Sequence, residues 1–222
     1  MSADTPAPAG PAPYPARAER LALCELMSQL GPDAPTMCEG WDTADLAAHL
    51  VVRENRPLAS AGIVVRPLAG LTERIRKSTR DSTPFPELVE RVQQGPPTWS
   101  LFGLPGMDKA LNTAEYFVHH EDVRRAQPGW EPRPADPARD EYLWRRLRAT
   151  ARLVMRKVPA EVTVVRPDGR TLLLTKGGRR ARVHGPISEL VLWVFGRGDV
   201  AQVRLTGEAD AVAALTEHRW RV

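Results

Sequence analysis

The chain has 222 residues, of which 42% are hydrophobic and 26% charged, the composition of a globular protein with enough residues for a substantial core. Its formal net charge is only +4, because 27 acidic residues are interspersed among 31 basic ones, and no basic stripe alternates with aromatic side chains. Nucleic acid is therefore not an expected partner. No apolar run approaches the ~18 residues of a membrane span, so no membrane partner is expected either.

The first residues and the cysteines indicate a compartment. The opening stretch "MSADTPAPAGPAPYPA" has neither the basic nor the apolar region of a secretory signal, and its Pro and Ala content predicts a disordered tail over residues 1–14. Cys24 and Cys38 form neither a metal-like pair nor a disulfide framework, so the cytoplasm is expected. Only four of the 31 Lys and Arg residues are Lys, a bias typical of a high-GC genome such as that of an actinobacterium.

Helices are predicted over the first two thirds of the chain, because apolar residues recur there at helical spacing. The segment "DTADLAAHLVVRENR" also begins at Asp42 and Thr43, which are good N-cap residues. The other helical segments, in chain order, are "ARAERLALCELMSQLG" before it and then "RPLAGLTERIRKSTR", "PFPELVERVQQG", residues 107–127 and "ARDEYLWRRLRATARLVMRKV".

The periodicity changes at Pro159. The segment "EVTVVRPDGRTLLL" reads as a strand, an Asp-Gly turn and a second strand, which predicts a hairpin. Further strands are expected in "ARVHG" and "AQVRLTG", and helices in "PISELVLWVFGRG" and "EADAVAALTEH". The predicted fold class is therefore α+β, with a helical bundle over residues 15–157 and a small α/β domain over residues 158–222.

The segment "NTAEYFVHHEDVRRAQ" places two histidines and three acidic residues in one helix. At 100° per residue, Glu115, His119 and Asp122 share a face with apolar residues, whereas His120 and Glu121 fall outside it. We therefore expect the first three side chains to point inward and the other two toward water. A carboxylate in a core is costly, so the inward groups need a cation or hydrogen-bonding partners.

A metal ion is one explanation of these inward groups. His49 lies on the apolar face of its own helix, and Glu115 and His119, four residues apart, lie one above the other. These three residues would supply three ligands and leave one open position, the pattern of catalytic zinc, with Asp122 orienting a ligand from behind. The alternative is ordinary pairing, with a hydrogen-bonded core histidine at His49 and an ion pair between Glu115 and His119.

Three segments of the chain, in the right order, resemble motifs of one family. The first, "CEGWDTADLAAHLVVRE", is similar to Cys-x-Gly-Trp followed by Leu-x-x-His-Leu, and "AEYFVHHEDVRRA" is similar to Glu-x-x-x-His-x-x-Asp. The third, "GPISELVLWVFGRGD", resembles Leu-x-x-Trp-x-x-Gly-Arg. All three motifs occur in the mycothiol-dependent maleylpyruvate isomerase family of the DinB-like superfamily.

The resemblance implies a four-helix bundle, a C-terminal α/β domain and a divalent metal, usually Zn²⁺. The ligands it implies are His49, Glu115 and His119, the same three that the helical geometry selects. Glu121 departs from the Trp that many relatives have just before the aspartate. The resemblance also implies that the metal activates a thiol, mycothiol, as a cosubstrate that attacks a small electrophile, so that the protein is an S-transferase or an isomerase.

Two arginines are candidate catalytic residues. Arg53 lies one turn after His49 and is a candidate for binding a substrate carboxylate, and Arg197 in "FGRG" is a candidate for reaching over the bundle site. Their alternatives are ion pairing for Arg53 and capping of a helix C-terminus for Arg197. Cys38 has no histidine beside it in sequence and is interpreted as a small buried residue next to Trp41.

The expected partners are therefore a small-molecule thiol and an electrophile, with the chain as a monomer or a homodimer. Two other functions stay open. One is a non-catalytic metal-binding module for sensing or interaction, which a closed site with four protein ligands would favour. The other is a metal-dependent hydrolase, in which metal-bound water is the nucleophile.

Overall fold

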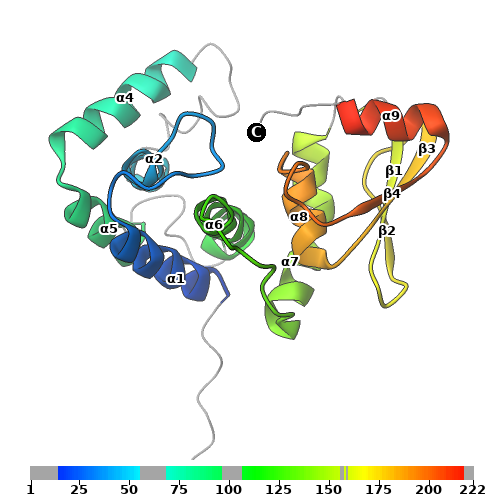
Figure 1. Cartoon of the computed structure of the whole chain (residues 1–222), viewed down its shortest axis with the longest axis horizontal. Coiled ribbons are helices and arrows are strands. Elements are labelled where there is room, and N and C mark those ends of the chain that lie inside the picture. Colours follow the sequence, from blue (N-terminus) through cyan, green and yellow to red (C-terminus); the bar gives the residue numbers. More distant parts are fainter. Residues whose placement is uncertain (1–14, 56–68, 97–106, 156–157, 159, 218–222) are drawn as a thin grey trace, which may run out of the picture.

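The computed structural model describes residues 15–55, 69–96, 107–155, 158 and 160–217, so the tail expected over residues 1–14 lies outside the described part. Within these ranges the chain forms eight helices and one four-stranded sheet (Figure 1), which confirms the predicted α+β class. The first six helices are α1 (Pro15–Leu30), α2 (Thr43–Asn55), α4 (Ala69–Ser82), α5 (Phe85–Gln94), α6 (Met107–Arg125) and α7 (Pro137–Val154). The remaining elements are β1 (Ala160–Val165), β2 (Thr171–Leu173), β3 (Arg179–His184), α8 (Ile187–Val194), β4 (Arg204–Gly207) and α9 (Ala209–Glu217).

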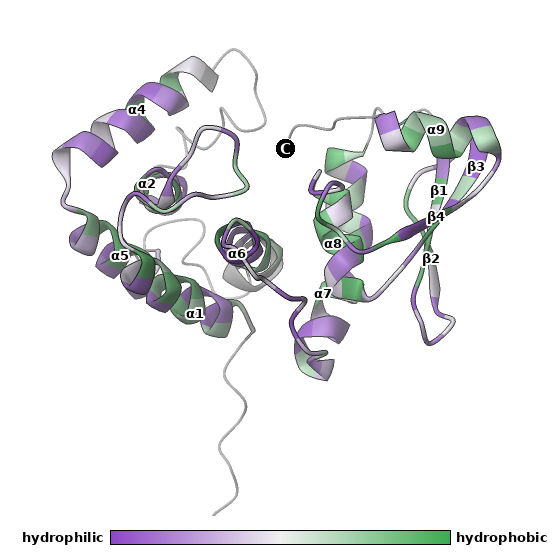
Figure 2. Ribbon diagram, viewed as in Figure 1, coloured by the Kyte–Doolittle hydropathy of each residue, from purple (hydrophilic) through white to green (hydrophobic). Residues whose placement is uncertain are grey.

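Four helices, α1, α2, α5 and α6, enclose an N-terminal apolar core. Each contributes buried side chains four or seven residues apart: Leu23 and Met27, Leu46 and Leu50, Leu88 and Val92, and Tyr116 and Val123. Helix α4 packs against α2 and is coloured mostly hydrophilic in Figure 2. This arrangement is the helical bundle that the sequence predicts.

The C-terminal sheet has the strand order β2-β1-β3-β4, with β1 parallel to β3 and the other pairs antiparallel. Strands β1 and β2 form the predicted hairpin, in which Gly169 adopts a positive φ of 82°. Alternate residues of β1, namely Ala160, Val162 and Val164, are buried in a second core shared with α7, α8 and α9. Because α7 packs on these C-terminal elements, the domain boundary expected at residue 158 stays a prediction.

Helix α6 lies in the middle of the molecule, between α1 and α2 on one side and α7 and α8 on the other (Figure 1). Tyr116 and Val123 belong to the bundle core, whereas Phe117 and Val118 belong to the core around the sheet. A helix that is covered on two sides has no single buried stripe. A helical wheel that assumes one apolar face therefore misplaces some of its residues.

The prediction that His120 and Glu121 point toward water is wrong for this reason, since the two residues are only 7% and 1% exposed. His120 Nδ1 lies 2.9 Å from Oε2 of Glu19 on α1. The Glu121 carboxylate is ion-paired with three arginines: Arg124, Arg125 and Arg133. These contacts supply the partners that a buried charge needs.

The start of α2 is held by a reciprocal cap. The Asp42 carboxylate accepts a hydrogen bond from the Asp45 N–H at 2.8 Å, and the Asp45 carboxylate accepts one from the Asp42 N–H at 3.4 Å. Asp45 is also ion-paired with Arg76 of α4. The cap fixes the first turn of α2, and His49 follows one turn after Asp45.

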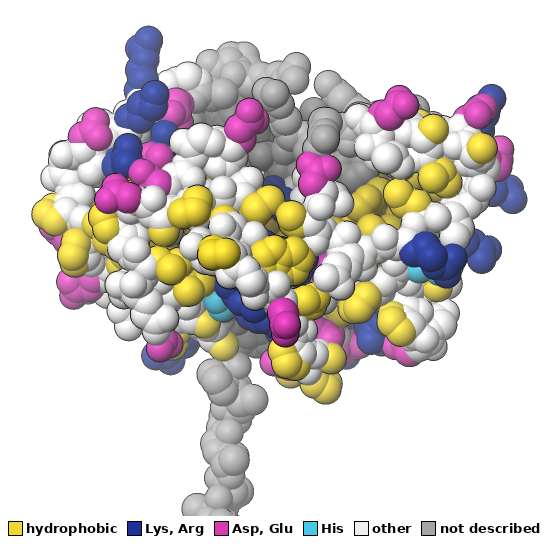
Figure 3. Space-filling model, in the orientation of Figure 1, with side chains coloured by type: hydrophobic (Ala, Val, Ile, Leu, Met, Phe, Trp, Pro, Cys, Tyr) yellow, Lys and Arg dark blue, Asp and Glu magenta, His cyan; other side chains and the backbone are white. Residues whose placement is uncertain are grey.

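On the face shown in Figure 3, Lys and Arg side chains are interspersed with Asp and Glu side chains and with hydrophobic ones. This mixture agrees with the low net charge of +4. None of the helices in the described ranges combines the length and apolar character that a bilayer crossing requires.

Candidate metal centre

Helices α2 and α6 bring His49, Glu115 and His119 together. One potential ligand atom from each residue lies within 4.8 Å of the other two. Glu115 Oε1 is 3.3 Å from His119 Nε2 and 3.7 Å from His49 Nε2, so both imidazoles face the same carboxylate. The two rings meet edge to face, with their centroids 5.4 Å apart. The set of side chains that the sequence analysis selected is therefore brought to one place.

The second nitrogen of His119 is held by Asp122. His119 Nδ1 donates a hydrogen bond to Asp122 Oδ2 over 2.9 Å, within the same helix. In a neutral imidazole this bond leaves the Nε2 lone pair facing Glu115 and His49. A carboxylate behind a histidine is the arrangement that commonly orients a metal-binding imidazole.

Arg197 reaches Asp122 from the loop after α8. Its Nε and Nη2 donate to the two carboxylate oxygens over 2.8 and 2.7 Å, while its Nη1 donates to the carbonyl of Phe195 over 2.6 Å. Arg197 thus bonds a carbonyl at the end of α8 and also extends to Asp122 of the bundle, and its catalytic role stays a prediction. Asp122 itself is fully buried.

Arg53 lies on the other side of the group. Its Nε is 3.3 Å from Glu115 Oε1, and its side chain is 8% exposed. The structure thus pairs Arg53 with Glu115, the carboxylate that faces the two histidines, which is the ion-pairing alternative considered for Arg53.

The charges of these groups depend on one another. Burial raises the pKa of Glu115, but Arg53 and the two histidines outweigh burial and hold that pKa well below its usual value. Burial likewise raises the pKa of Asp122, and the hydrogen bonds from His119 and Arg197 lower it overall. Both carboxyl groups are therefore ionised at neutral pH.

The two histidines differ in charge. Burial lowers the pKa of His49, and its contact with Glu115 does not compensate, so His49 is neutral at pH 7 and has a lone pair to share. Burial also lowers the pKa of His119, but hydrogen bonds to Asp122, Cys38 and Glu115 raise it well above its usual value. A metal at this position must displace a proton from His119.

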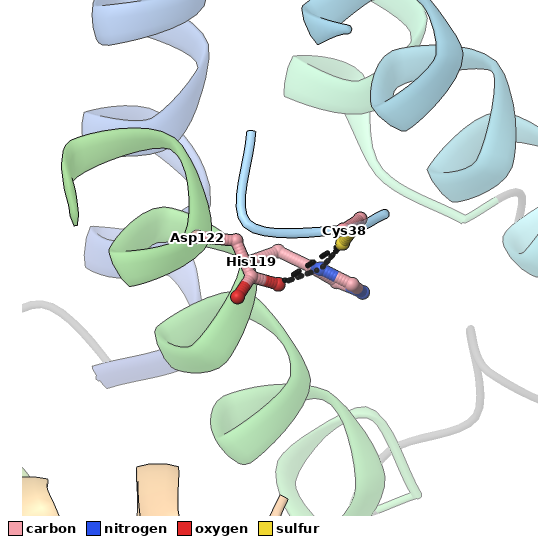
Figure 4. Close-up of side chains that lie close together, drawn as sticks. All are labelled: Cys38, His119 and Asp122. Atoms are coloured by element: carbon pink, nitrogen blue, oxygen red, sulfur yellow. Dashed lines mark hydrogen bonds and ion pairs between the residues drawn. The ribbon is translucent and has the colours of Figure 1, made fainter. Parts of the chain in front are cut away.

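Cys38 belongs to the site, and its interpretation as only a small buried residue is corrected. Its Sγ donates to Asp122 Oδ2 over 3.3 Å, lies 3.9 Å from His119 Nδ1 (Figure 4) and accepts from Arg197 Nη2 over 3.7 Å. His119 is 81 positions from Cys38 in sequence, so no local pattern connects the two residues. The signal for Cys38 was its place in the Cys-x-Gly-Trp motif.

The turn after Cys38 explains that motif. Trp41 N–H donates to the Cys38 carbonyl over 2.9 Å, and Gly40 has the positive φ of 75° that the turn needs. The Trp41 ring then packs against the His49 ring, with centroids 5.0 Å apart, while Arg76 lies over Trp41 at 4.7 Å. One short turn thus places Cys38 beside His119 and Trp41 beside His49.

A second group, formed by Cys38, His119 and Asp122, also has ligand atoms within 4.8 Å of one another. It uses His119 Nδ1, which already donates to Asp122, and both Asp122 oxygens accept hydrogen bonds from Arg197. A cation placed there would have to displace these hydrogen bonds, whereas His119 Nε2 and His49 Nε2 both face Glu115. The group around Glu115 is therefore the better candidate for a metal.

The described residues define an α+β protein in which a His–Glu–His group lies between two bundle helices and is supported from the C-terminal part. Two solved structures share this fold. One is a crystal structure of the mycothiol-dependent maleylpyruvate isomerase, with a TM-score of 0.53 and 14% sequence identity, covering 88% of this chain and 92% of that chain. The other is a histidine-to-alanine mutant of that enzyme, with a TM-score of 0.56 at the same identity and coverage.

The resemblance inferred from the three motifs is confirmed at the level of the fold, which is what a likeness at 14% identity shows. No family model matches the sequence, and no curated protein matches it. A likeness at this identity carries the fold and not the reaction or its substrates.

Proposed function

We propose that the protein is a divalent-metal-dependent enzyme that activates a low-molecular-weight thiol for attack on a small electrophile, as an S-transferase or an isomerase. The single observation that carries this proposal is the convergence of one atom each from His49, Glu115 and His119 within 4.8 Å. Two imidazole nitrogens and one carboxylate are a ligand set suited to Zn²⁺, which we propose as the metal. Such an ion is a Lewis acid that lowers the pKa of a bound thiol and supplies a thiolate near neutral pH.

The other residues have defined tasks in this proposal. Asp122 holds His119 Nδ1, so that Nε2 stays directed at Glu115. Arg53 and Arg197 each place a guanidinium at the edge of the group, within hydrogen-bonding distance of Glu115 and Asp122 respectively. We propose that these two cations are catalytic residues that hold and orient a carboxylate of the electrophile.

Mycothiol is the proposed thiol, because the solved structures that share the fold belong to a mycothiol-dependent isomerase and three motifs of this chain resemble that family. Cys24 and Cys38 are both free thiols, in keeping with a reducing compartment, and we place the activity in the cytoplasm.

The proposal is tested first by elemental analysis of the purified protein. The wild type is expected to carry about one equivalent of metal per chain, which His49→Ala and Glu115→Ala lose because three protein ligands become two. His120→Ala is the matched control, since His120 adjoins His119 in sequence but faces Glu19 at 2.9 Å. Equal loss of metal from His120→Ala would contradict the assignment.

The second test is thiol consumption with mycothiol and a panel of small electrophiles, with and without a carboxylate. The metal-loaded wild type should consume thiol, and His49→Ala should not. Stoichiometric metal without thiol consumption from any electrophile would favour the metal-binding module. Metal-dependent release of acid from ester or amide substrates without any thiol would favour the hydrolase.

A further inference from the structure

We propose that Arg125 is a positioning residue, which holds the loop after α8 where Arg197 can reach Asp122. The proposal rests on the proposed function, in which Asp122 and Arg197 serve the metal centre. Arg125 follows Asp122 by one turn of α6, so the two residues contact the same loop from neighbouring places on the helix. Asp122 binds the side chain of Arg197, and Arg125 binds the backbone of the loop that carries Arg197.

The contacts of Arg125 are buried. Its Nη1 and Nη2 donate to the two carboxylate oxygens of Glu189 on α8, over 3.0 and 2.6 Å. Its Nη1 also donates to the carbonyl of Val200 over 2.7 Å, and its Nε donates to Glu121 over 2.7 Å. The Arg125 and Glu189 side chains are 1% and 3% exposed, and the Trp130 ring lies 4.5 Å from the guanidinium of Arg125.

A hydrogen-bonded turn connects Val200, which Arg125 contacts, to Arg197. The N–H groups of Val200 and Ala201 donate to the Arg197 carbonyl, over 3.2 and 2.9 Å, and the Arg197 N–H donates to the Leu192 carbonyl. Glu189, the partner of Arg125, also accepts from the N–H of Gln202 over 2.8 Å. The loop is therefore fixed by Arg125 and Glu189 on one side of Arg197 and by the end of α8 on the other. A shift of Val200 moves Arg197 with it.

A purely structural role for Arg125 makes a different prediction. Removing one partner of a buried ion pair leaves an uncompensated charge and is destabilising in itself, so a loss of thermal stability in R125Q is expected under either role. If Arg125 only stabilised the fold, its loss would lower thermal stability and leave the properties of Arg197 in the folded fraction unchanged. If Arg125 positions Arg197, its loss should reproduce the loss of Arg197 and add nothing to it.

The experiment is a double-mutant cycle with R125Q, R197Q and the pair, and R124Q is the matched control. Arg124 is ion-paired with Glu121 as Arg125 is, yet its described hydrogen bonds go to Glu121 and the Glu131 carbonyl rather than to α8 or its loop. In thiol turnover, R125Q should keep its metal and lose kcat by about 10- to 100-fold, the cost of a misplacement of ~1 Å. R197Q should show the same loss, the double variant should lose no more than R197Q alone, and R124Q should stay within about twofold of wild type.

A second measurement needs no turnover, and so separates failure of this proposal from failure of the proposed function. Arg197 Nη2 is 3.7 Å from Cys38 Sγ, so its removal should change the rate at which iodoacetamide alkylates Cys38. Mass spectrometry resolves the two cysteines, and Cys24 is the internal control, since it is buried and its burial raises its pKa to about 12. R125Q should give the Cys38 rate of R197Q, and the double variant should give the same rate again.

E189Q keeps the shape of the side chain but replaces one carboxylate oxygen with an NH2 group, which cannot accept from Arg125 or from the Gln202 N–H. This variant decides the question if R125Q does not fold. A wild-type alkylation rate in folded R125Q or E189Q would overturn the proposal, as would effects of R125Q and R197Q that multiply in the double variant. An alkylation rate of Cys38 that does not change in R197Q would also overturn the proposal. Such a result would mean that Arg197 does not lie beside Cys38 and Asp122, where the proposal places it. The protein could consume no thiol while R125Q, R197Q and the double variant all show the same altered alkylation rate of Cys38. That result would contradict the proposed function and support the positioning role of Arg125.

Discussion

The Asp122 carboxylate lies between His119 and Arg197, accepting a hydrogen bond from His119 Nδ1 at 2.9 Å and from Arg197 Nη2 at 2.7 Å. One buried acidic side chain thus connects a bundle helix, a candidate metal ligand and the C-terminal loop. Its charge balances the guanidinium, and its position fixes the imidazole. The consequences of altering Asp122 follow from both contacts.

We predict that Asp122→Asn weakens metal binding about 10- to 100-fold, the usual cost of removing a carboxylate that orients a metal-bound histidine. The change keeps the shape of the side chain but removes the charge that holds His119 Nδ1. The measurement is a zinc titration against a competing chelator. The control is Glu121→Gln, which removes another buried negative charge that contacts arginines rather than His119. Equal zinc affinity in wild type and Asp122→Asn would show that Asp122 does not support the ligand.

We predict that Cys38→Ala keeps about one equivalent of metal, because the site around Glu115 uses His119 Nε2 and does not need the thiol. This variant distinguishes the two groups of potential ligands that share His119. Elemental analysis of Cys38→Ala beside His49→Ala gives the answer. Metal lost from Cys38→Ala and kept by His49→Ala would assign the ion to the group with Cys38 and Asp122.

The sequence was sufficient for the parts of this site that depend on one helix. Glu115 and His119 are four residues apart, so their alignment follows from helical geometry, and the face of α2 that carries His49 is apolar. Cys38 and Arg197 contact Asp122 but are 84 and 75 positions from it in sequence. At such separations the spacing of residues along the chain does not predict which side chains meet. Only their places in recognisable motifs indicated either residue.

The sequence did not predict which polar residues of α6 are buried, because this helix is covered by other elements on two sides. The helical periodicity of α6 predicts that His120 and Glu121 face water, and this prediction is wrong because both residues are buried. Helix α6 packs against α1 on one side and against α7 and α8 on the other, so partners such as Glu19 of α1 and Arg133, which follows α6, come from outside the helix. The amphipathic pattern of a helix reports how much of it is buried only when one side faces water.

We predict that the protein loses stability in acid through its buried carboxylates, of which Glu121 is a clear example outside the metal site. Burial raises the pKa of Glu121, but the arginines around it lower that pKa below the usual value. A carboxyl whose pKa is lower in the folded state stabilises the fold above its unfolded pKa of about 4.3, and this contribution is lost as the pH falls through the folded value. Chemical denaturation at several pH values between 7 and 3, with a chelator present, measures the effect.

Glu121→Gln should be less stable than wild type at pH 7 and should lose less of its free energy of unfolding on acidification. Arg145→Gln is the control, because its partner Glu141 is on the surface and its side chain is 73% exposed, so little change is expected at either pH. Parallel losses of stability in wild type and Glu121→Gln between pH 7 and pH 3 would rule out the assigned role of Glu121.

We predict finally that zinc binding releases about one proton near pH 7 and strengthens as the pH rises. His119 has a raised pKa in the metal-free protein, whereas His49 and the ionised Glu115 have no proton to lose. The metal competes with the proton at His119, so its affinity falls as the pH falls below the raised pKa. Titration calorimetry in buffers of different ionisation enthalpy counts the protons directly. Asp122→Asn removes the charge of the group that does most to raise this pKa, so this variant should release less than one proton when it binds zinc. Unchanged proton release would show that the displaced proton is not on His119.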